Sequence, residues 1–174
     1  AEATQKIYSN SSAEFTQTCF HPDSILLLFG DNQGAMSMLD IRTANEFKFI
    51  ASSEQCNGLG GVTKLAVSEN GYHVGTGHEN GIVALWDLRK LALVKSHEIQ
   101  SNRITCLDFD WAGKNLVSAC GSDVCLMNVK SWNVVKTLSG HTKDVTGCQF
   151  NKTLMTDTLW TVSLDKTMKL WETN

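Results

Sequence analysis

The sequence predicts an all-β fold made of four copies of one structural unit, each with about four short antiparallel strands. Three observations predict it. An apolar residue and a Thr, followed four residues later by a second apolar residue, occur four times in the chain. Short runs rich in Val, Ile, Leu, Thr and aromatic residues are separated by turn sequences such as GDNQG, SENG and HENG. No long window shows the period of about 3.6 residues that is typical of an amphipathic helix.

Each unit starts with the repeated pattern and continues with further apolar runs. The first runs are Phe15–Phe20, Val62–Val67, Ile104–Phe109 and Val145–Phe150, so successive units start 47, 42 and 41 residues apart. The second runs are Leu26–Gly30, Tyr72–His78, Asn115–Cys120 and Thr158–Ser163. The third runs end in Leu39-Asp40, Trp86-Asp87, Met127-Asn128 and Trp171-Glu172. A weaker fourth run occurs at Phe47–Ala51, Ala92–Lys95 and Val134–Leu138, and none follows Trp171.

A period of this length with four strands is the unit of a β-propeller blade. Because Trp-Asp closes a third strand, the chain resembles WD-repeat propellers along nearly its whole length. The predicted blades are 11–51, 58–95, 97–138 and 140–174. The resemblance implies about four four-stranded antiparallel blades, the C-terminal part of a seven-bladed ring, with 1–174 forming a partial propeller.

The ends of such a partial ring are predicted to expose apolar sheet faces. We expect Lys6–Ser9 to be the outer strand of an absent preceding blade, and the remaining blades of the ring to be partners of this chain. The alternative is a closed four-bladed ring in which Lys6–Ser9 pairs beside Met168–Trp171. An open run of blades is expected to associate or to melt with poor cooperativity when it is isolated.

The last blade carries the full stabilising set of WD repeats. The resemblance implies a hydrogen-bond chain through a structural tetrad of His141, Ser163, Asp165 and Trp171. Ser, His and Asp also make up a hydrolase triad. The sequence lacks a nucleophile elbow and an oxyanion-hole signature, so we assign no catalytic residue. The other blades depart from the set: His97 follows Ser rather than Gly, and Met127 and Leu39 replace the Trp.

Nothing in the sequence predicts a cofactor or a metal. The GLGG stretch lacks the Lys-Ser/Thr and the helix that a phosphate loop needs, and none of the six cysteines occurs in a Cys-x-x-Cys motif. We therefore expect small buried thiols rather than a zinc site. The net charge of −3 comes without a basic block, which disfavours nucleic acid as the main partner. The longest apolar run, Ile25–Phe29, cannot cross a membrane, so we expect a soluble intracellular protein.

WD-repeat geometry also implies a face on which partners dock. It places two exposed positions per blade there, one in the loop before the first strand and one in the turn after the second. These positions are Glu14, Asn32, Gly61, Glu79, Arg103, Cys120, Asp144 and Leu164. Acidic residues outnumber the single Arg, which predicts a mildly acidic surface for a basic or mixed-charge protein segment; the alternative is a set of solvated loop charges.

A more specific resemblance lies in three stretches. Val67–Leu91, Gly121–Trp132 and Phe20–Ile25 are similar to the C-terminal propellers of spliceosomal U-box ubiquitin ligases. This resemblance implies a nuclear, non-catalytic module that recruits ubiquitination substrates and spliceosomal subunits in mRNA processing and DNA repair, whereas the U-box and a coiled coil would lie elsewhere in the parent. The alternatives are a WD-repeat adaptor or scaffold of another intracellular complex and an RNA-contacting surface.

Overall fold

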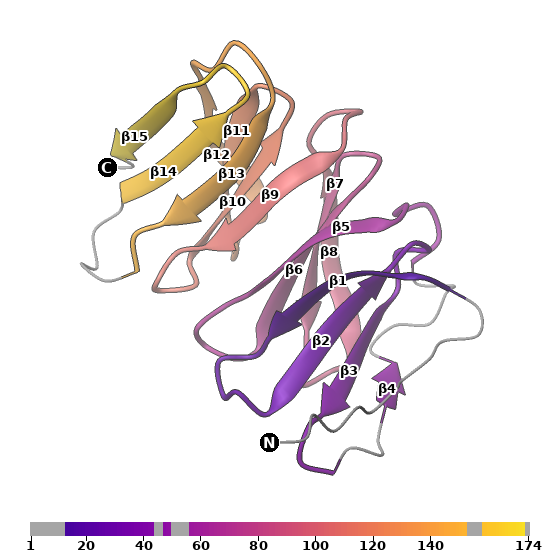
Figure 1. Ribbon diagram of the computed structural model, residues 1–174. Helices are drawn as coiled ribbons and strands as arrows, with labels where there is room; N and C mark the ends of the chain where they lie inside the picture. Colours follow the sequence, from indigo (N-terminus) through magenta and orange to yellow (C-terminus); the bar gives the residue numbers. More distant parts are fainter. Residues whose placement is uncertain (1–12, 44–46, 50–55, 153–157, 173–174) are drawn as a thin grey trace, which may run out of the picture.

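The computed structural model describes residues 13–43, 47–49, 56–152 and 158–172. These residues form four antiparallel sheets that follow one another along the chain (Figure 1). The first sheet contains β1 (Phe15–Phe20), β2 (Leu26–Asp31), β3 (Met36–Asp40) and β4 (Phe47–Phe49). The second contains β5 (Val62–Val67), β6 (His73–His78), β7 (Ile82–Asp87) and β8 (Ala92–Glu98). The third contains β9 (Ile104–Phe109), β10 (Asn115–Cys120), β11 (Asp123–Asn128) and β12 (Asn133–Ser139), and the last contains β13 (Val145–Phe150), β14 (Thr158–Ser163) and β15 (Met168–Glu172).

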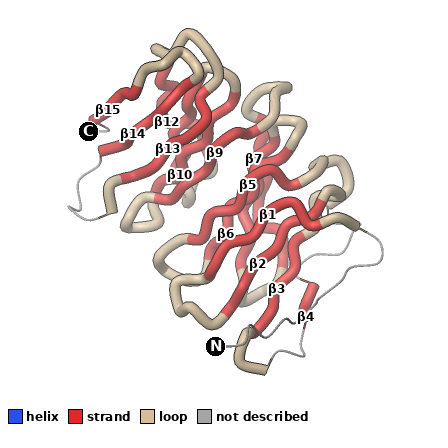
Figure 2. The backbone as a smooth tube through the Cα atoms, viewed as in Figure 1, coloured by secondary structure: helices blue, strands red, loops and turns tan. Residues whose placement is uncertain are grey.

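Each sheet is one blade of a partial β-propeller, so the predicted all-β fold class is confirmed. Within every blade the strands pair in chain order, and β1, β5, β9 and β13 lie next to one another from blade to blade. The blades form an open arc with the first and last sheets at its two ends (Figure 2). His97, which the predicted bounds place at the start of the third blade, lies inside β8 of the second blade, where it pairs with Val83. Lys6–Ser9 falls outside the described residues.

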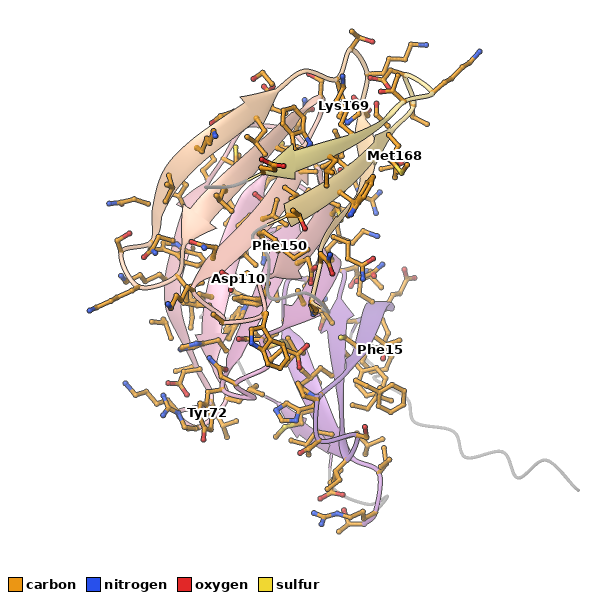
Figure 3. All side chains as sticks on the ribbon, turned by 90° about the vertical axis from the view of Figure 1, so that its left-hand side faces the viewer. Phe15, Tyr72, Asp110, Phe150, Met168 and Lys169 are labelled. Carbon is orange, nitrogen blue, oxygen red and sulfur yellow. The ribbon has the colours of Figure 1, made fainter. Side chains whose placement is uncertain are left out.

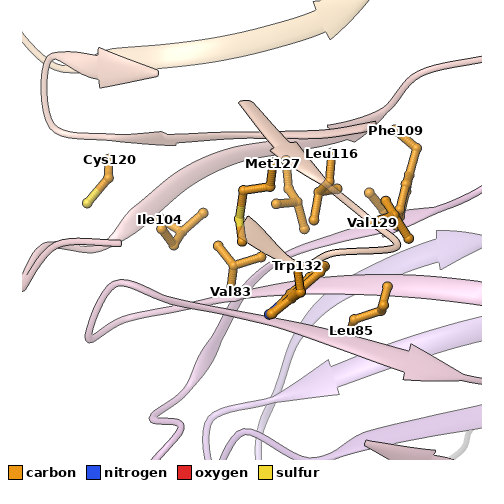
Figure 4. Packing of buried hydrophobic residues seen from close by; sticks show 11 residues of the cluster. Val83, Leu85, Ile104, Phe109, Leu116, Cys120, Met127, Val129 and Trp132 are labelled. Carbon is orange, nitrogen blue, oxygen red and sulfur yellow. The ribbon is translucent and has the colours of Figure 1, made fainter. Parts of the chain in front are cut away.

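The core lies between blades rather than within them. Three clusters of buried side chains fill the three interfaces between successive sheets. At the interface of the second and third blades, Ile104, Phe109 and Met127 pack against Val83 and Leu85 (Figure 4). Burial of each such side chain stabilises the folded state by about 1.5–3 kcal/mol. Cohesion between blades therefore depends on how closely adjacent sheets approach.

Two glycines in β6 permit that approach. A Cβ atom at Gly77 would lie 2.5 Å from Cγ2 of Ile104, and one at Gly75 would lie 3.1 Å from Cδ2 of Leu107. Real Cβ atoms do not come as close to a branched side chain as the first distance requires. Gly77 is therefore needed where the second and third blades meet.

The repeated Thr forms a hydrogen bond from one blade to the next. Thr16 Oγ1 donates to the carbonyl of Val62 at 2.6 Å, and Thr63 Oγ1 donates to that of Ile104 at 2.7 Å. Thr105 repeats the contact with the carbonyl of Val145 at 2.5 Å. In each case the acceptor is the apolar residue that starts the same pattern in the next blade. The repeated pattern thus encodes the connection between blades as well as a strand.

The last blade exposes the surface that the other blades cover. Strand register places Trp160 opposite Leu170 and Val162 opposite Met168, and we call these four residues the trailing face. The same positions in the second blade are Gly75, Leu85, Gly77 and Val83, which the third blade buries. On the trailing face the exposed fractions range from 41% for Trp160 to 64% for Met168, which is labelled on β15 in Figure 3.

Candidate functional site

The last blade contains a continuous chain of side-chain hydrogen bonds beneath its loops, which we call a relay. The indole Nε1 of Trp171 donates to Thr161 Oγ1 at 2.9 Å, and Thr161 Oγ1 lies 2.9 Å from Nε2 of His141. His141 Nδ1 lies 2.8 Å from Oδ2 of Asp165. A neutral imidazole with its proton on Nδ1 satisfies every link, because the Thr hydroxyl then donates to Nε2 and Nδ1 donates to the carboxylate. The relay ties the third strand to the loop that precedes the first.

Asp165 is the anchor of this relay. Thr167 Oγ1 donates to its Oδ1 at 2.6 Å, and the backbone N–H groups of Thr142 and Thr167 donate to its two oxygens. The hydrogen bond from Thr167, followed by the one from His141, holds the pKa of Asp165 well below its ordinary value. The carboxylate therefore stays ionised and fixes the imidazole.

Ser163 does not belong to the relay, and this part of the prediction was wrong. Its hydroxyl donates to the carbonyl of Lys143 at 2.9 Å and accepts the backbone N–H of Asp165 at 3.1 Å. Ser163 is the last residue of β14, so its side chain sits at the level of the loops. Thr161 projects from the same side of the strand two residues earlier, within reach of the indole.

A second relay occurs in the second blade, and sequence reasoning missed it. Trp86 Nε1 donates to Thr76 Oγ1 at 2.9 Å, and Thr76 Oγ1 lies 2.8 Å from Nε2 of His78. His78 Nδ1 lies 2.8 Å from the carbonyl of Gly60. Burial lowers the pKa of this imidazole. His78 occupies the strand position that Ser163 has in the last blade, and the Gly60 carbonyl takes the place of the Asp165 carboxylate. The two relays therefore use the same sequence of groups in space, from indole to hydroxyl to imidazole to an oxygen acceptor. Their residues follow a different order along the chain.

The third blade retains the hydroxyl without the rest of the relay. Ser118 occupies the strand position of Thr76 and Thr161, while Met127 stands where the other two blades have Trp. Ser118 is fully buried, and its Oγ has no hydrogen-bond partner among the described residues. The methionine thus leaves one polar atom unsatisfied.

The loop residues predicted to bind partners do gather in pairs at one end of the blades. Glu14 and Asn32 exchange hydrogen bonds, with Asn32 N donating to Glu14 O at 2.9 Å. Leu164 N donates to Asp144 O at 3.0 Å. The exposed members define what we call the loop face: Glu14, Asn32, Glu79, Arg103, Asp144 and Leu164.

Gly61 and Cys120 are buried, so the expectation that they are exposed was wrong. Gly61 lies beneath Asn32 and Glu79, and a Cβ atom there would come within 3.0 Å of the Asn32 carbonyl oxygen. Cys120 is 1% exposed, and its thiol donates to the carbonyl of Asn102. Both positions therefore shape the loop face from below without contacting a partner.

The relays do not provide the parts of a hydrolytic site. The hydroxyl of Thr161 is occupied by Trp171 and His141, and the His141 side chain is 1% exposed, so no substrate carbonyl reaches it. All six cysteines are free thiols, and within the described ranges no group of three or more His, Cys, Asp and Glu side chains could hold a metal ion. The described part of the chain also has no helix that could span a membrane.

Four sequential blades, threonine links between them and Trp-Thr-His relays define a WD-repeat β-propeller. Comparison with known families agrees with this class. The chain belongs to the β-propeller family described as nucleolar protein 10-like, N-terminal domain, whose model matches residues 4–162.

Curated relatives and solved structures add detail. The chain is 36% identical over 134 residues to pre-mRNA-processing factor 19 homolog 2 of Arabidopsis thaliana, covering 74% of this chain and 24% of that protein. It is 34% identical over 142 residues to pre-mRNA-processing factor 19 of Oryza sativa subsp. japonica, covering 78% and 25%. It therefore spans about a quarter of these relatives. A chain in the crystal structure of the mitotic checkpoint complex has the same fold, with a TM-score of 0.81 and 16% identity, over 94% of this chain and 51% of that one.

Proposed function

We propose that this chain is the non-catalytic docking part of a nuclear pre-mRNA splicing factor of the U-box ubiquitin ligase type. In this role the loop face recruits ubiquitination substrates and spliceosomal proteins. The similarity to pre-mRNA-processing factor 19 of several organisms carries the proposal, because it extends over most of this chain. The relays support it physically, since they fix the loops that a partner would contact.

The charge of the loop face supports a protein partner of basic or mixed charge. Glu14, Glu79 and Asp144 are exposed there against the single Arg103. Opposite charges across an interface raise the rate of association more than they raise affinity. The structural tetrad, now with Thr161 in place of Ser163, is proposed to stabilise the last blade and to take no chemical part.

A comparative pull-down tests this function. Tagged chain is incubated with nuclear extract, and bound proteins are identified by mass spectrometry for the wild type and for Glu79→Lys/Asp144→Lys. We expect splicing proteins with the wild type and their loss in the double variant. The control is Glu69→Lys/Glu172→Lys, which makes the same charge change at exposed sites at the opposite end of the blades.

The outcomes separate the alternatives. Equal capture by all three proteins would contradict the role of the loop face. Capture of another defined complex instead of splicing proteins would make the chain an adaptor of that complex. Loss of the bound proteins after ribonuclease treatment would indicate that RNA rather than protein makes the contact.

A further inference from the structure

A groove of about 520 Å³ lies between the second and third blades, away from the loop face. Its lining includes His73 at the start of β6, Lys95 on β8, and Lys114 and Lys130 beside the third sheet. β6 ends at His78 near the loop face, so His73 marks the opposite end of the blade. The groove is therefore independent of the proposed function.

The groove has an apolar floor. Leu85 and Val129 line it and are 2% and 7% exposed, while Val94 lines it and is 45% exposed. Trp132 packs in the same core cluster as Leu85 and Val129, so that floor is supported from within (Figure 4). Covering Val94 with an apolar side chain of a partner would remove apolar surface of both molecules from water, which favours binding.

The rim of the groove is basic. Lys95, Lys114 and Lys130 are exposed, and none of them forms an ion pair with another described residue. Lys95 Nζ donates to the carbonyl of Lys130 at 3.2 Å, which holds one ammonium group across the groove. Three uncompensated charges occur here although the whole chain carries a net charge of −3.

Neighbouring groups leave this positive charge available. Asp87, which pairs with His73 in the β-ladder, is held by Arg89 through a contact of 2.7 Å. Asn70 Oδ1 accepts backbone N–H groups, so its Nδ2 donates to His73 Nδ1 at 3.2 Å. In the neutral ring this assigns the proton to Nε2, which makes His73 a further donor.

We propose that this groove binds an acidic protein segment that carries an apolar side chain. The carboxylates pair with the three lysines, and the apolar side chain covers Val94 and the floor. A protein segment fits better than a single-stranded nucleic acid, because the lining contains no Arg, Phe, Tyr or Trp, and the single imidazole of His73 does not provide a row of rings on which successive bases could stack.

The third blade supplies matched controls for this proposal. Register places Lys95 opposite Leu85 in β7 and Lys136 opposite Leu126 in β11, so Lys136 is the equivalent lysine in the next blade. Val135 is likewise the equivalent of Val94 and is 62% exposed. Neither control residue lines the groove.

Fluorescence anisotropy with the full chain tests the site. The probe is a labelled peptide of Asp and Glu residues around a Leu-Leu pair. We expect Lys95→Gln, Lys114→Gln and Lys130→Gln each to weaken binding about two- to fivefold, and added NaCl to weaken it further. Val94→Ser should also weaken binding, whereas Lys136→Gln and Val135→Ser should leave it unchanged.

Two altered probes complete the test. A peptide with amides in place of the carboxyl groups and one with Ser in place of Leu should each bind more weakly than the parent. No binding of the parent peptide, equal binding of the amide peptide, or equal losses in the groove and control variants would overturn the proposal. Tighter, lysine-dependent binding of a polyuridine oligomer would assign the groove to RNA and would overturn it as well.

Discussion

Replacing Thr63 by Val tests whether the repeated threonine joins the blades. Thr63 is 1% exposed, and its hydroxyl lies 2.7 Å from the Ile104 carbonyl of the next blade and 3.0 Å from the Gly77 carbonyl of its own. Val has a similar volume and a high β-propensity, so neither a cavity nor a backbone penalty is expected. The change removes one hydrogen bond, worth about 0.5–1.5 kcal/mol, and leaves a buried acceptor without its donor, which costs about 1–3 kcal/mol.

The expected loss in the free energy of unfolding is therefore about 1–3 kcal/mol. Urea titration followed by circular dichroism measures it, and amide hydrogen exchange in β5 and β9 shows whether the loss lies at this interface. Thr146→Val is the matched control. Thr146 belongs to the same repeat but is exposed, and among the described residues its hydroxyl has one hydrogen bond, of 3.4 Å, to the Val162 carbonyl of its own blade. Its replacement should cost less than about 0.5 kcal/mol. Equal destabilisation by the two substitutions would refute the reasoning.

Three further predictions concern the relays. Thr161→Val should lower the free energy of unfolding by about 1–3 kcal/mol in urea titration, because it leaves an indole N–H unpaired. Ser163→Ala should cost less. A larger loss for Ser163→Ala than for Thr161→Val would show that Ser163 does belong to the relay. Ser118→Ala should be neutral or stabilising in the same assay, since it removes a buried hydroxyl that has no partner among the described residues; a loss above about 1 kcal/mol would contradict this. The lowered pKa of His78 means that the unfolded chain binds a proton first, so its contribution to stability is complete above about pH 6.5 and decreases as the pH falls. The melting temperature of His78→Gln should therefore change less between about pH 7.5 and about pH 5.5 than that of His73→Gln; equal changes would exclude His78 as the cause.

The strands and their repetition could be predicted from the amino-acid sequence alone. The spacing of the apolar-Thr pattern located β1, β5, β9 and β13, and the turn sequences separated the following strands. These features are local, because a strand of alternating side chains and a Gly-containing turn each depend on a few consecutive residues. The all-β class and the partial propeller follow from the same local features repeated four times.

Which polar groups meet depends on the tertiary structure. Thr161 and Ser163 both carry hydroxyl groups on one side of β14. Thr161 belongs to the relay because its hydroxyl lies within hydrogen-bond distance of the Trp171 indole. His78 enters its relay from a strand although His141 enters from a loop, so no fixed spacing identifies both. The hydrogen bonds between blades connect residues that are about 40 positions apart in the chain, and the groove is likewise lined by residues of two blades. Their geometry depends on the packing of adjacent sheets, and local sequence patterns do not contain it.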